Sequence, residues 1–504
     1  MSIEASAVDE SAVSSRKITR NASIYLAAQI ISWVVTFVSL TVFSRTIGKS
    51  GTGILAFLSN AFAPIAILTL GIDSFLVKEL GRDRSLVGPL MRATFGIRLV
   101  SLPIILCLSI VVLWWLKLTP SVWAVAVAMI AMNQVCIFSE PIRSMLVALE
   151  QPRRVAIIDI STGVGSILAI PFLRYGPIAI VIAALTTHVV MLCVRWWWIR
   201  DMVRLVPSFD LTVWRGLILG GIPFIVNVWI MQWYGFTGVW MLNHFVNNDA
   251  VGVFANAQKL IGTFMFVSAA ISSALLPSMS RMADRSPEEL RALETRIIET
   301  LIVLGVPFAA LLFLLAKPVS LLIFGHTFFE MPLTLQAYSF ALVPIYIVST
   351  IYMFVIARGR NAVWTIYLVI TVGIFAIAAW ALVPFMRDHF HNGAAGAAAA
   401  TAIAETIAAL LGIKLVGINL LNRDFISRLF RCGIATLGMA AVIWLTQRFF
   451  VIVPLALGLS AFLLIAAKLH VLPPREQDLI VEWVKGKLGR FRSGGSAPGE
   501  SPAP

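Results

Sequence analysis

Long apolar runs, separated by short polar segments, repeat along almost the whole chain. About 14 of these runs are each roughly 18–25 residues long, the length that an α-helix needs to cross the hydrocarbon core of a bilayer. The pattern therefore predicts an all-α polytopic membrane protein. The predicted spans cover residues 22–44, 52–76, 93–116, 121–147, 155–173, 177–199, 216–242, 250–276, 297–324, 334–357, 362–386, 393–413, 432–450 and 452–470.

The composition agrees with this pattern and excludes a soluble fold. Hydrophobic residues make up 59% of the 504 residues and charged residues only 13%, a balance that no water-soluble domain tolerates. The first 20 residues are polar, and no small-residue cleavage site follows a short apolar core. We therefore expect residues 22–44 to form a retained first helix and not a signal peptide.

The polar segments between the predicted spans alternate between basic and nearly uncharged. The basic set carries about 29 Lys and Arg residues and the other set about 7, and cytoplasmic loops of membrane proteins concentrate these residues. Both termini are thus expected in the cytoplasm. The net charge of +14 follows from the same loops, which lie beside anionic lipid, so no nucleic-acid partner is expected.

The two halves of the chain resemble each other. Predicted spans 2 and 8 open with IGKSGTGILA at residues 47–56 and VNNDAVGVFA at residues 246–255. Prolines follow in the same order, Pro103 and Pro141 in one half and Pro307 and Pro344 in the other, about 200 residues apart. Six spans separate the copies, and an even number leaves both in one orientation. We expect two parallel six-helix lobes, at 22–199 and 216–413, and two further helices at 432–470.

Three segments are expected outside the bilayer. Residues 1–21 form a cytoplasmic N-terminal tail. Residues 475–492 place Ile480, Trp483 and Leu488 on one helical face with lysines and arginines elsewhere, which predicts an interfacial amphipathic helix on membrane lipids. The Gly-, Ser- and Pro-rich residues 493–504 are expected to be disordered.

Charged residues inside the spans are candidates for function, because an unpaired charge in hydrocarbon is costly. Lys259 lies in span 8 without a carboxylate nearby in sequence, and Asn256 shares its helix face. Lys259 can neutralise an anionic cargo, or it is a structural lysine. Arg98 either snorkels to the cytoplasmic edge or contributes to a cavity. Glu405 in span 12 either takes up protons for coupling or is a hydrogen-bonded structural residue.

Glu140 and Arg143 are three residues apart on span 4, so they are expected to pair on one helix face. This pair either neutralises itself for structural reasons or takes part in transport. Two other carboxylates are expected to pair close in sequence: Asp159 with Arg153 or Arg154, and Asp73 with Lys78.

A set of amide and aromatic side chains suits sugars, which need hydrogen bonds and a flat apolar surface together. These residues are Gln29, Asn60, Asn227, Gln232 and Trp233. The alternative is structural, since Asn and Gln also join membrane helices and Trp marks membrane interfaces.

No catalytic site is evident in the sequence. The four cysteines show no Cys-x-x-Cys spacing, which predicts no disulfide framework and no metal site. No cofactor is expected, because there is no Walker-type phosphate loop, and no carboxylate or His cluster has catalytic spacing. The chain is therefore expected to be a transporter and not an enzyme.

Three segments resemble one known family: FSRTIGKSGTGILAF at 43–57, DAVGVFANAQKL at 249–260 and ALLPSMSRMADRS at 274–286. With the two six-helix lobes, they resemble the polysaccharide transporters of the MOP exporter superfamily, the Wzx-type flippases. The resemblance implies a cavity between the lobes, lined by spans 1, 2, 7 and 8. It also implies a cargo of polyprenyl-pyrophosphate-linked oligosaccharide units for exopolysaccharide, O-antigen or capsule.

The same resemblance implies a bacterial inner membrane, transport from the cytoplasmic to the periplasmic leaflet, and polysaccharide polymerase and chain-length proteins as partners. Two other functions stay open. A multidrug or toxin cation antiporter of the same superfamily would need intramembrane carboxylates, whereas cations predominate here. A membrane-embedded polysaccharide polymerase or ligase would need a sizeable extramembrane loop, and no gap between the spans is that long.

Overall fold

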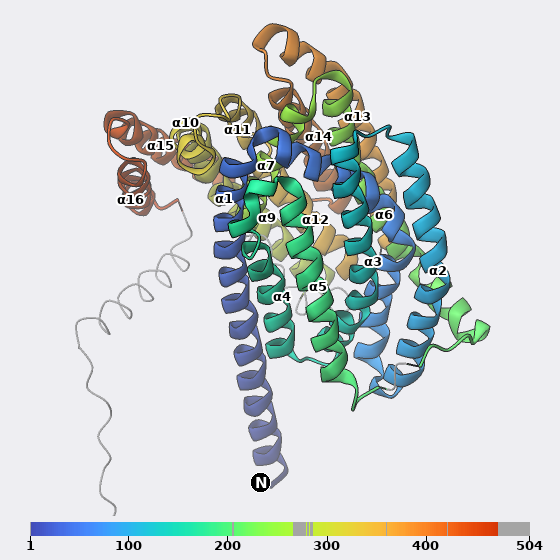
Figure 1. Ribbon diagram of the computed structural model, residues 1–504. Coiled ribbons are helices and arrows are strands. Elements are labelled where there is room, and N and C mark those ends of the chain that lie inside the picture. Colours follow the sequence, from blue (N-terminus) through green and yellow to red (C-terminus); the bar gives the residue numbers. More distant parts are fainter. Residues whose placement is uncertain are drawn as a thin grey trace, which may run out of the picture.

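The chain is helical throughout the part that its structure, a computed structural model, describes (Figure 1). That part comprises residues 2–203, 206–265, 279, 282, 286–358, 360–420 and 422–471, and for residues 2–30, 33, 66–70, 166, 287, 356, 357 and 361 it comprises the backbone alone. The predicted amphipathic helix at 475–492 and the tail at 493–504 lie outside the described residues. Within these ranges, eight helices are long and apolar enough to span a membrane.

The first lobe begins with α1 (Ser2–Arg82), in which two helices meet at Gly48. Gly48 has a φ of 68°, a left-handed conformation that glycine adopts without a steric penalty. The chain turns there, between predicted spans 1 and 2. The other elements of this lobe are η1 (Arg84–Leu86), α2 (Val87–Trp115), α3 (Pro120–Ala148), α4 (Pro152–Ile167), η2 (Ile170–Tyr175) and α5 (Pro177–Ile199).

The second lobe repeats this order with more breaks. Its helices are α6 (Leu211–Phe245), α7 (Asn248–Phe264), α9 (Pro287–Leu314), α10 (Ala316–Phe324), α11 (Met331–Ser339), α12 (Leu342–Ala357), α13 (Asn361–Phe390) and α14 (Gly393–Val416). Helices α11 and α12 are bent by 50° relative to each other; counted as one broken span, they bring the number of candidate spans among the described residues to nine.

The packing within the lobes follows the repeat. In the first lobe α1 contacts α4, and α5 contacts both α3 and α4; in the second, α6 contacts α13, and α14 contacts both α12 and α13. Corresponding helices therefore have corresponding neighbours. The predicted fold of two parallel six-helix lobes is confirmed.

Short polar side chains explain where several helices begin. Asp210, Asn247 and Asn392 accept backbone hydrogen bonds from the first turns of α6, α7 and α14, as N-cap residues do. Asp83 caps η1 in the same way, and the hydrogen bonds from the Ser85 hydroxyl and amide lower the pKa of its carboxyl group.

The last two helices, α15 (Arg423–Thr446) and α16 (Ile452–Lys468), form a hairpin outside the repeat. They pack against each other, and α15 also packs against α9. Arg428 Nη2 lies 2.5 Å from Glu299 Oε2 of α9 and fixes the hairpin to the second lobe. In Figure 1 the hairpin stands at one edge of the bundle, beside α10.

Candidate functional site

The two lobes meet where α1 crosses α7, close to the Gly48 turn. A Cβ at Gly53 would lie 1.8 Å from the Asn248 carbonyl oxygen, and a Cβ at Gly252 would lie 2.0 Å from the Lys49 carbonyl oxygen. In the repeat, Gly53 corresponds to Gly252 and Lys49 to Asn248, so the contact is reciprocal. The backbones touch directly, which only glycine permits at these two positions. We call this contact the glycine seam.

Charged side chains join the lobes beside the glycine seam. Lys49 Nζ lies 2.7 Å from Glu330 Oε1 and 3.6 Å from Asp249 Oδ2, and 4.4 Å from the centre of the Phe329 ring. Arg45 Nε donates to the Ile323 carbonyl oxygen at 3.1 Å, at the C-terminal end of α10. The last carbonyls of a helix lack intrahelical donors and attract cations. The lobes are thus closed against each other at the end of the molecule that the sequence predicts to be periplasmic.

Asn256 belongs to this closure. Its side chain is 1% exposed, and its Nδ2 donates to Thr52 Oγ1 of α1 at 3.3 Å. The sequence placed Asn256 on one cavity face with Lys259. The structure corrects this, because Asn256 points into the packed contact between α1 and α7.

Lys259 lies less than one turn further along α7 and is exposed. It is exposed although α7 packs against α1, α6, α11 and α14, so its helix is surrounded and its side chain is open. A cation in such a position can reach an anionic group without first breaking an ion pair with a neighbouring helix.

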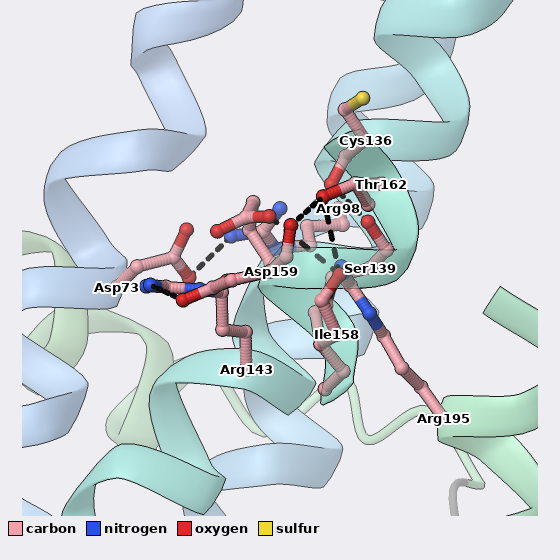
Figure 2. Close-up of polar contacts among 10 residues, drawn as sticks. Asp73, Arg98, Cys136, Ser139, Arg143, Ile158, Asp159, Thr162 and Arg195 are labelled. Atoms are coloured by element: carbon pink, nitrogen blue, oxygen red, sulfur yellow. Dashed lines mark hydrogen bonds and ion pairs between the residues drawn. The ribbon is translucent and has the colours of Figure 1, made fainter. Parts of the chain in front are cut away.

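Three ion pairs occupy the interior of the first lobe (Figure 2). Arg98 Nη2 contacts Asp73 Oδ1 at 2.5 Å. Arg143 donates from Nε and Nη2 to the two oxygens of Asp159, at 2.8 and 2.9 Å. The third pair is Arg195 with Glu140, 3.6 Å apart. Every pair joins two different helices.

The sequence predicted the wrong partners for these charged residues. Glu140 was expected to pair with Arg143, Asp159 with Arg153 or Arg154, and Asp73 with Lys78. In each case the partner comes from a neighbouring helix instead. Nearby positions on one helix offer weak pairing in water, whereas inside a bilayer the alternative to an interhelical partner is an uncompensated charge.

Two of these arginines differ from what the sequence suggested. Arg98 is 1% exposed, so it neither snorkels to the edge nor reaches a cargo in this conformation. Arg195 was one of the about 29 cations that the sequence assigned to the basic segments between spans, but it is 2% exposed and also donates to the Ser139 carbonyl oxygen at 3.0 Å. Its position four residues before the end of span 6 already placed it within hydrocarbon depth.

Two hydrogen bonds connect α6 to other helices of the second lobe. Tyr234 Oη donates to Glu405 Oε1 at 3.1 Å, joining α6 to α14. Thr365 Oγ1 of α13 donates to Asn227 Oδ1 at 2.7 Å. Glu405 therefore has the structural hydrogen bond that was one of its two expected roles, and its role in coupling stays a prediction.

The other candidate sugar contacts lie on several faces. Asn60 donates to the Ala56 carbonyl oxygen at 2.9 Å and faces Gly235 of α6, between the lobes. Gln232 is half-buried. Trp233 is exposed and stacks edge to face with Trp229 and Phe236. The side chain of Gln29 lies outside the described part of the chain. Whether these residues line a cavity stays a prediction.

No group of three or more His, Cys, Asp or Glu side chains that could hold a metal ion occurs among the described residues. Cys107, Cys136, Cys193 and Cys432 are all free thiols.

A family model described as polysaccharide biosynthesis protein matches residues 42–332, more than half of the chain. No curated protein sequence matches the chain. Among solved structures, the lipid II flippase MurJ in an inward closed conformation is similar at a TM-score of 0.73 and 15% identity, and the match covers 90% of this chain and 99% of MurJ.

Two other solved structures show the same fold. An inward-facing multidrug resistance MATE family transporter of the MOP superfamily matches at a TM-score of 0.61 and 14% identity, over 79% of this chain and 97% of its own. A MOP superfamily transporter from Pyrococcus furiosus matches at 0.57 and 13% identity, over 80% and 94%. The chain therefore has the fold of MOP transporters.

Proposed function

Since this chain belongs to the polysaccharide biosynthesis protein family, we propose that it is a flippase for the lipid-linked precursors of a surface polysaccharide. It resides in the bacterial inner membrane with both termini in the cytoplasm. It moves polyprenyl-pyrophosphate-linked oligosaccharide units from the cytoplasmic to the periplasmic leaflet. Polymerase and chain-length proteins then act on the delivered units.

The observation that carries the proposal is the reciprocal glycine contact between equivalent positions of the two lobes. The glycine seam and the Lys49–Glu330 contact close the end that carries few cations, which the charge bias assigns to the periplasm. We infer that this end stays closed while cargo enters from the cytoplasm and opens to release it. MurJ, which moves a lipid-linked sugar, has a similar fold over 90% of this chain.

Lys259 is the residue that we assign to the cargo. A pyrophosphate carries negative charge into a region where charge is costly, and the exposed ammonium on α7 offsets part of that charge. Arg98 and Arg143 are left out of this assignment, because both are engaged with carboxylates of the first lobe. The lobes then rock about the seam region, and the outer end opens to release the head group.

The decisive experiment is deletion of the gene in its host, followed by analysis of lipid-linked intermediates in each leaflet. We expect an oligosaccharide-pyrophosphate-polyprenol to accumulate on the cytoplasmic side while surface polymer is lost. Normal lipid-linked pools with intact polymer would refute the proposal. Sensitivity to cationic drugs in that case would identify an antiporter.

Variants of Lys259 test its role within the same strain. Lys259→Ala should abolish polymer export at normal protein level, because the charge on α7 is lost, and Lys259→Arg should retain most export because the charge remains. Lys317→Ala is the matched control, since Lys317 is an exposed lysine at the start of α10. Full export by Lys259→Ala would remove Lys259 from the mechanism.

A further inference from the structure

A cavity lies beside the glycine seam, near the start of α7. It has a volume of about 380 Å³, within the range of small-molecule pockets, about 300–1,000 Å³. Phe57 of α1 contributes to its apolar wall, and Trp115 and Lys117 come from the turn between α2 and α3. Asn243 and Asn248 come from the corner between α6 and α7.

The polar groups of this cavity are held in place. Asn243 Nδ2 donates to Asn248 Oδ1 at 2.6 Å, and the Asn248 backbone is fixed by its contact with Gly53 in the glycine seam. Lys117 has a φ of 47°, a left-handed conformation that side chains other than glycine rarely adopt. Strained backbone of this kind concentrates at ligand sites.

The aromatic groups of the cavity are available for stacking. Trp115 is 60% exposed. Trp240 also lines the cavity, and its ring lies parallel to that of His244, with centroids 5.2 Å apart. Flat apolar rings beside amide donors and acceptors bind one class of ligand well, because a sugar ring presents an apolar face and a rim of hydroxyl groups.

From these features we propose that the cavity is a carbohydrate site, separate from the transport pathway and sized for one or two sugar residues of a periplasmic glycan. A sugar ring lies against Trp115, and its hydroxyl groups bond with Asn243, Asn248 and Lys117. This site goes beyond the proposed transport activity. Its test does not depend on transport, because binding is measured on the purified protein.

Residues of both lobes line the cavity, so a bound glycan affects how the lobes move relative to each other. Phe57, Trp115 and Lys117 are on the first lobe, and Trp240 and Asn243 are on the second. Separation of the lobes at this end takes the two walls apart. A ligand that contacts both walls binds the closed arrangement more tightly and shifts the population toward it. Glycan at the outer surface therefore holds this end of the molecule closed.

The test is calorimetric binding to the protein in lipid nanodiscs. The probe is the mixture of oligosaccharides released by mild acid from the surface polymer of the producing cell. Trp115→Ala should weaken binding about tenfold through loss of a stacking partner. Trp114→Ala is the matched control, because this neighbouring tryptophan is 78% exposed and does not line the cavity. Lys259→Ala should leave binding unchanged.

Two further variants distinguish loss of the binding site from loss of the folded structure. Lys117→Gly keeps the left-handed turn accessible while it removes the ammonium, and weaker binding at an unchanged unfolding temperature would assign the effect to the ammonium. Glu330→Lys faces Lys49 with a like charge, opens the outer end and should abolish binding, whereas Glu150→Lys at the opposite end should not. Equal binding by the Trp114 and Trp115 variants, loss of binding only in Lys259→Ala, or no binding at all would overturn the proposal.

Discussion

The two lobes share one arrangement of helices and fill it with different chemistry. In the first lobe, three arginine–carboxylate pairs connect helices at the depth of the bilayer. In the second, hydrogen bonds connect α6 to α14 and α13, from Tyr234 to Glu405 and from Thr365 to Asn227. Two ion pairs, Glu294–Arg358 and Glu299–Arg428, connect the N-terminal half of α9 to the C-terminal end of α12 and to α15. A repeat thus preserves packing while polar partners diverge.

This difference between the lobes bears on how each of them functions. Charges that are paired inside the first lobe are committed to holding its helices together. In the second lobe, Lys259 is an exposed cation on α7. At the glycine seam the two lobes use the same residue type in the same way. Variants at the seam and in the two interiors therefore give different results.

The largest effect is expected at the glycine seam, where the lobes are equivalent. Gly53→Ala and Gly252→Ala should each abolish polymer export, because the new Cβ would meet backbone of the other lobe at about 2 Å or less and prevent closure. The measurement is surface polymer in the deletion strain at matched protein level. Gly262→Ala is the control, since nothing lies within 4 Å of its Cβ position on the same helix. Loss of export in only one of the two variants would show that the two seam glycines are not equivalent.

The next largest effect is expected from the buried pair of the first lobe. Arg98→Ala should destabilise the protein by about 3–5 kcal/mol, because Asp73 is left as an uncompensated buried charge. Thermal unfolding of the purified protein in detergent measures this. The double variant Arg98→Met with Asp73→Asn should recover most of the stability, since neither charge remains. A double variant as unstable as the single one would show that packing and not charge carries the effect.

The smallest effect is expected in the second lobe. Tyr234→Phe removes one hydrogen bond to Glu405 and should cost about 1 kcal/mol, in the range measured for hydrogen bonds between membrane helices. The same unfolding assay applies, with Tyr352→Phe as a control for a tyrosine that is exposed. A loss as large as that of Arg98→Ala would mean that the interiors of the lobes are energetically alike.

Much of the fold could be predicted from the sequence, because the bilayer imposes its thickness on every span. The turn at Gly48, the parallel repeat and the order of the helices follow from run lengths, charge bias and the match between residues 47–56 and 246–255. The glycine seam was also visible, as two equivalent glycines, although its direct backbone contact was not.

The partners of the charged residues could not be predicted in the same way. Arg143 with Asp159, and Arg195 with Glu140, depend on which helices become neighbours and how each is rotated. The spacing of residues along one helix does not indicate which helices are neighbours or how each helix is rotated. The burial of Asn256 could not be predicted for the same reason. Asn256 and Lys259 are three residues apart on α7, but Asn256 lies against α1 and Lys259 is exposed.

The paired charges of the first lobe have a consequence for the energetics of transport across an energised membrane. Three arginines and three carboxylates, in their ionised forms, sum to zero, so this body can rotate without carrying net charge through the electric field. The membrane potential then acts on the anionic head group and on Lys259. Moving one elementary charge through 100 mV is worth about 2.3 kcal/mol. An inside-negative potential therefore drives the anionic load of the proposed function outward, while these three pairs return without electrical work.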